Sequence, residues 1–205
     1  MSKRFENLKK IPPDPAAKLL ANANTKLQTP VNLPASAPVP AVMAALEAQE
    51  ARLDMLRLLS VALPPREATW WACLAARDLI GADAKKVPPP LATAERWVFK
   101  PTSENRAAAS DAFHHAEQDD DTVYCAMAAL YADGTLGVDG DLANYPAPPQ
   151  GVSAAVFAMN LLAMRAHADQ ANAFMDMLID RGVDIARGGN GKAPADGGPK
   201  ADAKG

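Results

Sequence analysis

The sequence has few of the residues that build disulfide frameworks and histidine-rich metal sites. Its 205 residues include two cysteines and three histidines. Two cysteines cannot form a disulfide framework, and three histidines leave little room for a metal site of the histidine type. Only six serines are present, and none lies in the strand–turn–helix setting of a hydrolase nucleophile. We therefore expect no disulfide scaffold, no cofactor and no bound metal.

Long apolar runs are also missing. The longest weakly polar run, about residues 151–164, contains Asn160 and is well short of the ~20 residues that a membrane-spanning helix needs. The N-terminal stretch MSKRFENLKK carries charge but no following apolar segment, so no signal peptide is expected. These absences predict a cytoplasmic protein with reduced cysteines and no membrane partner.

Basic charge is scarce in the second half of the chain. The net charge of −3 argues against a dedicated nucleic-acid binder. No Lys or Arg occurs between Arg106 and Arg165, and the acidic residues of this interval gather in two predicted loops. The candidate partner-binding acids are Glu117, Asp119, Asp120, Asp121, Asp139 and Asp141. If these loops share one end of the molecule, that end attracts a basic protein partner. The alternative is solubility and helix capping.

Alanine is abundant, with 44 residues, and this favours helices that pack closely. Apolar periodicity and helix breakers predict an all-α bundle of about six helices. Thr102 or Ser103 is expected to cap the fourth helix and Ser153 the sixth. The expected helices span about 41–62, 65–80, 90–99, 103–117, 121–132 and 153–181.

The same patterns divide the chain into three parts. Residues 1–40 hold seven prolines, six basic and two acidic residues and few large apolar ones, so they are expected to form a flexible basic arm. Residues 41–181 form the helical bundle. Residues 182–205, rich in Gly, Ala and Lys, are expected to be a disordered tail.

Two of the expected helices, 65–80 and 121–132, are almost entirely apolar, which places them at the centre of the bundle. They also resemble one another at a spacing of 53 residues, so an alternative organisation is two degenerate helical-hairpin repeats. Cys73 and Cys125 lie in these two helices and are expected to be core thiols.

Adjacent tryptophans mark the helix at 65–80. Neighbouring positions on a helix diverge by ~100°, so one of Trp70 and Trp71 can face the core while the other faces the rim. An exposed tryptophan is a good anchor for a protein partner. Trp71 is our candidate for that role, and core packing is the alternative for both residues.

Several apparent motifs carry little chemistry. His114, His115 and Glu117 have the residue types of a metal site, but adjacent histidines on a helix cannot both point at one ion. The stretch GGNGK at 188–192 lacks the preceding strand and the hydroxyl residue of a phosphate-binding loop.

Three short motifs resemble an uncharacterised bacterial family of small helical proteins. They are LPPREATWWACLAAR at 63–77, AERWV at 94–98 and PTSENRAAA at 101–109. Members of that family share a Trp-Trp-Ala-Cys helix and are often encoded near type VI-like secretion loci. The resemblance implies a helical fold over about residues 41–180 and an accessory, adaptor or chaperone role, and it implies no catalytic residues.

These observations predict a non-catalytic helical adaptor or accessory protein that binds a protein partner, either a basic one or a component of a secretion apparatus. A small metal-dependent or ligand-binding enzyme using the turn at 114–121 is the alternative from another class. An immunity-type inhibitor is a further alternative. The oligomeric state is left open by the sequence.

Overall fold

The chain folds into helices joined by loops of varied length. The structure, a computed structural model, describes residues 3–81 and 86–192, and these ranges contain nine α-helices, three 3₁₀ helices and no β-strand. The all-α prediction is confirmed. The α-helices are α1 (Ala16–Asn22), α2 (Val39–Glu47), α3 (Arg52–Ala62), α4 (Pro65–Ile80), α5 (Pro89–Phe99), α6 (Ser103–His114), α7 (Val123–Leu130), α8 (Gly151–Ala166) and α9 (Ala171–Arg187). In the described ranges, no helix combines the length and the apolar character that crossing a bilayer demands.

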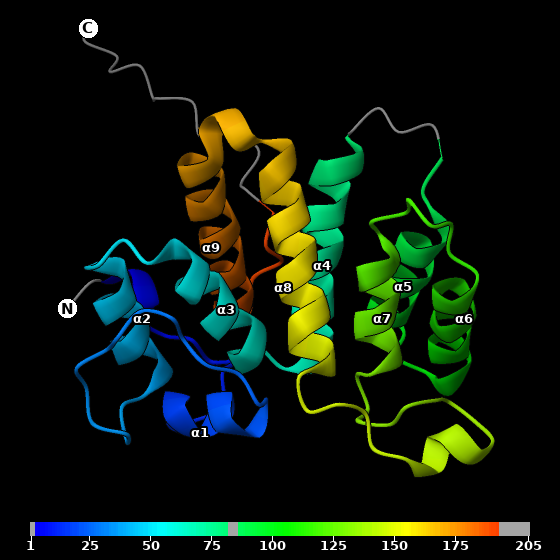
Figure 1. Cartoon of the computed structure of the whole chain (residues 1–205), viewed down its shortest axis with the longest axis horizontal. Helices are drawn as coiled ribbons and strands as arrows, with labels where there is room; N and C mark the ends of the chain where they lie inside the picture. The colour runs from blue at the N-terminus through cyan, green and yellow to red at the C-terminus, as the bar shows by residue number, and fades with distance from the viewer. Residues whose placement is uncertain (1–2, 82–85, 193–205) are drawn as a thin grey trace, which may run out of the picture.

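Helices α4 and α8 form the centre of the molecule (Figure 1). On one side, α3 packs against α8 and α9 and carries α1 and α2. On the other side, α5, α6 and α7 contact one another, and α5 and α7 also contact α4. The central position of α4 is confirmed, and α7 is enclosed by α4, α5, α6 and α8 as expected.

Small residues allow the close packing of α4. Its buried side chains are Ala68, Thr69, Trp71, Ala72, Cys73, Leu74, Ala75 and Ala76. The facing helix α8 also buries small residues, among them Ala155 and Ala163. Since alanine loses no side-chain freedom in a helix and adds little bulk, such a pair of helices can approach closely. The proposed hairpin repeat remains a prediction.

Two of the expected helices are each divided in two. The expected helix at 41–62 breaks between α2 and α3, where Glu50 adopts a φ of 54°. The expected helix at 153–181 breaks between α8 and α9 at a short 3₁₀ turn, Ala168–Gln170. Ser153 does not cap α8, which begins two residues earlier, and its hydroxyl donates to the Gln150 carbonyl oxygen at 3.2 Å.

The ends of the other expected helices are close to the prediction. The Thr102 hydroxyl accepts a hydrogen bond from the amide of Asn105 at 3.3 Å, so Thr102 caps α6 as expected. Helix α6 ends at His114 instead of residue 117. The Gly81 backbone ends α4 with a φ of 79°, a conformation that glycine adopts without strain.

The flexible arm predicted at 1–40 is wrong for residues 3–40. Phe5 is 1% exposed and Val39 1% exposed, and both belong to the core. Arg4 pairs with Glu47 and Asp180, at 2.9 Å and 2.8 Å. The low overall hydrophobicity of the segment misled the prediction, because its few large apolar side chains are buried against the bundle.

The boundary predicted for the tail is also wrong. Helix α9 continues to Arg187, and Gly182, expected to open the tail, is buried in it. Asp184, in the last turn of α9, accepts a hydrogen bond from the amide of Gly191 at 2.9 Å. This bond folds residues 188–192 back onto the bundle. The rest of the predicted tail, 193–205, lies outside the described residues.

Candidate functional site

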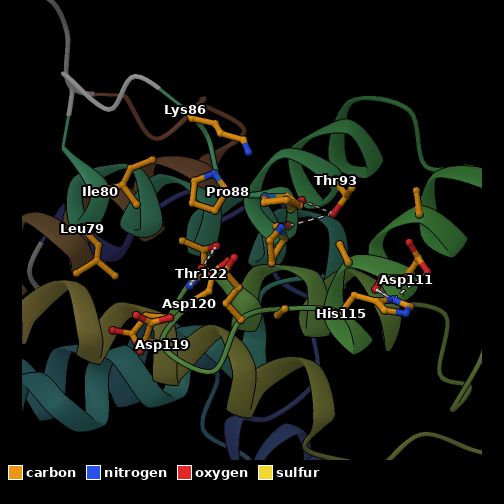
Figure 2. A pocket seen from close by; sticks show the side chains of 17 residues that line it. Leu79, Ile80, Lys86, Pro88, Thr93, Asp111, His115, Asp119, Asp120 and Thr122 are labelled. Atoms are coloured by element: carbon orange, nitrogen blue, oxygen red, sulfur yellow. Dashed lines mark hydrogen bonds and ion pairs between the residues drawn. The ribbon is translucent and has the colours of Figure 1, made fainter.

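A cleft of about 770 Å³ opens where four helices meet. It lies between the end of α4, the start of α5, the end of α6 and the turn from α6 to α7 (Figure 2). Its apolar lining consists of Leu79, Ile80, Pro88, Pro89, Pro90, Ala108, Ala112 and Ala116. Its charged lining consists of five carboxylates, Asp111, Glu117, Asp119, Asp120 and Asp121, and one lysine, Lys86. The cleft therefore combines an apolar wall with a carboxylate rim.

Rigid elements hold the apolar wall. Pro88 precedes α5, and Pro89 and Pro90 are its first two residues, where the fixed φ of proline suits a helix start. Leu79 and Ile80 are half-buried in the last turn of α4. In the view of Figure 2, Leu79 and Asp119 lie at one end of the cleft, and Asp111 and His115 lie at the other.

The rim carboxylates differ in what they bind. Asp120 accepts hydrogen bonds from the amide and the hydroxyl of Thr122, at 2.9 Å and 2.6 Å, and so fixes the start of α7. Glu117, Asp119 and Asp121 are exposed, and none of them takes part in an ion pair within the described ranges. The turn thus holds three carboxylates toward solvent beside an apolar wall.

One histidine lines the cleft. His115 Nδ1 lies 2.9 Å from the backbone oxygen of Asp111 and 3.1 Å from its carboxylate. His114 Nδ1 lies 2.7 Å from the Ser110 oxygen, and this ring lines a second hollow of about 350 Å³ along α6. Over residues 3–81 and 86–192, no three His, Cys, Asp or Glu side chains are grouped so that they could hold a metal ion.

The two predicted acidic loops line different hollows. Asp139 lines the second hollow, which shares Asp111 and His115 with the cleft. Asp141 is exposed in the 3₁₀ turn of residues 141–144. The buried Arg106 guanidinium fixes the loop to α6, because it donates to the Gly137 and Leu130 carbonyl oxygens, both at 2.9 Å. The carboxylates of residues 117–121 therefore form the cleft rim without Asp139 and Asp141.

Trp71 is not part of any surface. Its side chain is 0% exposed, and its indole nitrogen donates to the Leu178 carbonyl oxygen at 3.0 Å. The prediction of Trp71 as a partner contact is therefore wrong, because this side of α4 faces α9. Its neighbour Trp70 is the half-buried tryptophan and contacts Phe99, which is 70% exposed.

The sequence contained a partial signal for this aromatic pair. Adjacent tryptophans on one helix showed that one of the two reaches the rim, but not which one. Phe99 gave no signal, because a phenylalanine in the last turn of an apolar helix is usually a core residue.

Both cysteines are free and buried in the core. Burial raises the pKa of the Cys73 thiol well above its ordinary value, and a hydrogen bond with Cys125 adds to this effect. A neutral buried thiol is a poor nucleophile, since the thiolate is the reactive form. The predicted packing role of Cys73 and Cys125 is consistent with this burial.

Comparison with known proteins places the chain in a family. A model of the family of unknown function DUF6931 matches residues 42–186, from within α2 to the end of α9, and the chain belongs to this family. This confirms the expectation of an uncharacterised family. No curated protein and no solved structure matches the chain.

Proposed function

We propose that this protein is a non-catalytic helical adaptor or accessory protein, which binds a basic segment of a partner protein in the cleft between α4, α5, α6 and α7. One observation carries the proposal. An apolar wall and three exposed carboxylates without ion pairs in the described ranges share a single hollow of about 770 Å³.

The carboxylate rim and the apolar wall contribute differently to binding. The carboxylates of Glu117, Asp119 and Asp121 attract and orient a basic segment, and complementary charge raises the association rate more than the affinity. The apolar wall, including Ile80 and Pro90, removes apolar side chains of the partner from water. Binding therefore weakens, without disappearing, when salt screens the charges.

The exposure of the rim favours binding over catalysis. Catalytic acids and bases are commonly found in partly buried places, where their protonation is adjusted by neighbours. Glu117, Asp119 and Asp121 are solvent-exposed, and Asp120 is occupied by Thr122. A docking surface uses such carboxylates directly.

The identity of the partner class is a narrower proposal. Three motifs of the sequence resemble proteins encoded near type VI-like secretion loci, and the one at 101–109 contributes Ala108 on α6 to the cleft lining. We therefore infer that the partner is a cytoplasmic component of such a secretion apparatus.

A defined peptide tests the cleft without knowledge of the natural partner. The probe is a fluorescein-labelled 12-residue peptide of alternating Lys and Leu, titrated with the protein and followed by fluorescence anisotropy. We expect the Asp119→Asn/Asp121→Asn variant to raise the Kd at least tenfold. Carbodiimide, which joins a lysine amine to a carboxylate in contact, should link the peptide to residues 117–121.

The matched control is Asp139→Asn/Asp141→Asn, which changes the net charge equally at a loop outside the cleft. We expect its Kd to stay within a factor of two of the unmodified protein. Equal Kd values for the two variants, or cross-links spread over all acidic residues, would show that only the overall charge attracts the peptide and would refute the cleft.

The secretion proposal has its own test in the native host. Untagged protein is cross-linked with carbodiimide and the linked peptides are identified by mass spectrometry. We expect residues 117–121 to be joined to lysines of a secretion-apparatus component. Links from these residues to other proteins alone would refute the narrower proposal and leave the cleft as a binding site.

A further inference from the structure

A second surface, of opposite charge, lies at the other end of α5. We name it the aromatic corner and define it by Trp70, Phe99, Lys10, Arg66 and Lys192, which line a hollow of about 390 Å³. The hollow lies between the first half of α4, the end of α5 and the segment that follows α9. It shares no residue with the acidic cleft.

The aromatic pair of the corner is held in place before any partner arrives. The ring centroids of Trp70 and Phe99 lie 5.4 Å apart in an edge-to-face arrangement. The indole nitrogen of Trp70 donates to the Asn190 carbonyl oxygen at 2.8 Å, which fixes the ring. Phe99, at 70% exposure, is the most exposed of the large apolar side chains described. An ordered and exposed aromatic ring next to a hollow is a typical anchor of a protein interface.

Basic groups surround the pair. The Lys192 ammonium lies 5.8 Å from the centroid of the Trp70 ring. The Arg66 Nε donates to the Val98 carbonyl oxygen at 2.7 Å, which holds the guanidinium at the rim. Lys10 pairs with Glu67 at 3.0 Å, and Glu67 is the single acidic residue that lines this hollow. The corner therefore presents more positive than negative charge.

We propose that the aromatic corner is a second interaction surface, which binds an acidic protein segment carrying an apolar side chain. The carboxylates of the segment pair with Lys192 and Arg66, and its apolar side chain packs on Phe99 and enters the hollow. Charge complementarity selects this occupant, since a basic segment would meet like charge here.

Helix α5 links the two surfaces. It begins with Pro89 and Pro90 in the acidic cleft and ends with Val98 and Phe99 at the corner. Eleven residues of helix are about 16 Å long, so the two surfaces are separate sites at opposite ends of α5. A protein with two surfaces of opposite charge can bring a basic and an acidic partner together.

The test uses a fluorescein-labelled 12-residue peptide of alternating Glu and Leu, again followed by anisotropy. We expect the Phe99→Ala/Lys192→Gln variant to raise the Kd at least tenfold. The control Tyr145→Ala/Lys26→Gln removes an exposed aromatic ring and an exposed lysine elsewhere and should stay within a factor of two. Equal Kd values for these two variants would overturn the proposal.

Tryptophan emission locates the peptide independently. With an unlabelled peptide, the emission should shift to shorter wavelength, and Trp70→Phe should abolish the shift, because Trp71 and Trp97 are already buried. No shift would overturn the proposal. Without peptide, the emission could instead shift as the protein concentration rises, with dimers seen in sedimentation. That result would show that a second copy of the chain occupies the corner, and it would overturn the proposal of an acidic segment. The cleft variant Asp119→Asn/Asp121→Asn should keep the full shift, so failure here is separate from failure of the cleft.

Discussion

The indole nitrogen of Trp71 on α4 is hydrogen-bonded to the carbonyl oxygen of Leu178 on α9 at 3.0 Å. Gly182 follows one turn later on α9, and a Cβ atom there would lie 3.1 Å from the Trp71 ring. The absence of a side chain at residue 182 thus lets α9 approach the largest side chain of the core. This contact joins the central helix to the last helix of the described chain.

Replacing Trp71 should therefore damage stability, not binding. We expect Trp71→Ala to lower the free energy of unfolding by about 3–5 kcal/mol, the usual cost of emptying a large core site. Trp70→Ala removes a half-buried ring and should cost less. Urea unfolding followed by circular dichroism measures both. Equal losses would contradict the burial of Trp71.

Filling the space at Gly182 should force α9 away from α4. We expect Gly182→Leu to destabilise the protein by about 1–3 kcal/mol or more, because the new side chain meets Trp71 and Leu59. Ala173→Leu, at an exposed position of the same helix, is the control and should be close to neutral. Thermal unfolding of the two variants measures both effects, and equal losses of stability would contradict the close contact at Gly182.

The Arg106 guanidinium is a buried connector between α6 and the 134–151 loop. It donates to the oxygens of Leu130 and Gly137 and pairs with Asp133. We expect Arg106→Met to destabilise by about 1–3 kcal/mol, because the buried carbonyl oxygens of Leu130 and Gly137 lose their donor. Cleavage of the loop by a protease should become faster.

The control for Arg106 is an exposed ion pair. Lys18 binds Asp14 on the surface, and Lys18→Ala should cost at most about 1 kcal/mol. A protease pattern at the 134–151 loop that is the same in both variants would show that Arg106 does not organise it.

Asp54 should make the free energy of unfolding depend on pH in the acidic range. Burial by itself raises the pKa of this carboxyl, but hydrogen bonds from Thr29 and Gln28 and the charge of Arg57 outweigh it, so the pKa lies below its ordinary value of 3.8. A carboxyl with a lowered folded pKa stabilises the fold above its unfolded pKa, and this stabilisation is lost as the pH falls through the folded pKa.

We therefore expect Asp54→Asn to lower the free energy of unfolding by about 1–3 kcal/mol at neutral pH. The difference from the unmodified protein should shrink as the pH falls from about 5 toward 2. Urea titrations over this range measure it. Asp14→Asn, at a surface pair with Lys18, serves as the control and should show a much smaller difference. A difference for Asp54→Asn that is constant with pH would contradict the lowered pKa.

The thiols of Cys73 and Cys125 should be protected in the folded protein. We expect a thiol reagent such as DTNB to leave the native chain unlabelled and to label two thiols in urea. Burial and the raised pKa of Cys73 give the same expectation. Rapid labelling of the native protein would show that α4 and α7 separate readily.

Much of the helical framework was predictable because strong local signals set it. Gly81 ends α4, Thr102 caps α6, and the prolines before α4 and α5 start those helices. The division of 41–62 into two helices was not predictable, because residues 49–51 (Gln, Glu, Ala) are all good helix formers. The break depends on the positive φ of Glu50, which the sequence does not reveal.

The candidate site was predictable only in its charge. A run of acids at 117–121 marked the rim, but the apolar wall joins the end of α4 to the start of α5 and the end of α6. Contacts of this kind depend on how helices pack, which periodicity along one segment does not describe. The burial of Phe5 and Leu8 escaped prediction for the same reason.

The two ends of the described chain close on each other. The Lys10 amide donates to the Ala186 oxygen at 2.8 Å, and Arg187 donates to the Arg4 oxygen at 2.6 Å. The N-terminal segment leaves the ribosome before its partners on α9. Its contacts with Ala186 and Arg187 can therefore form only after all the helices between them have been made.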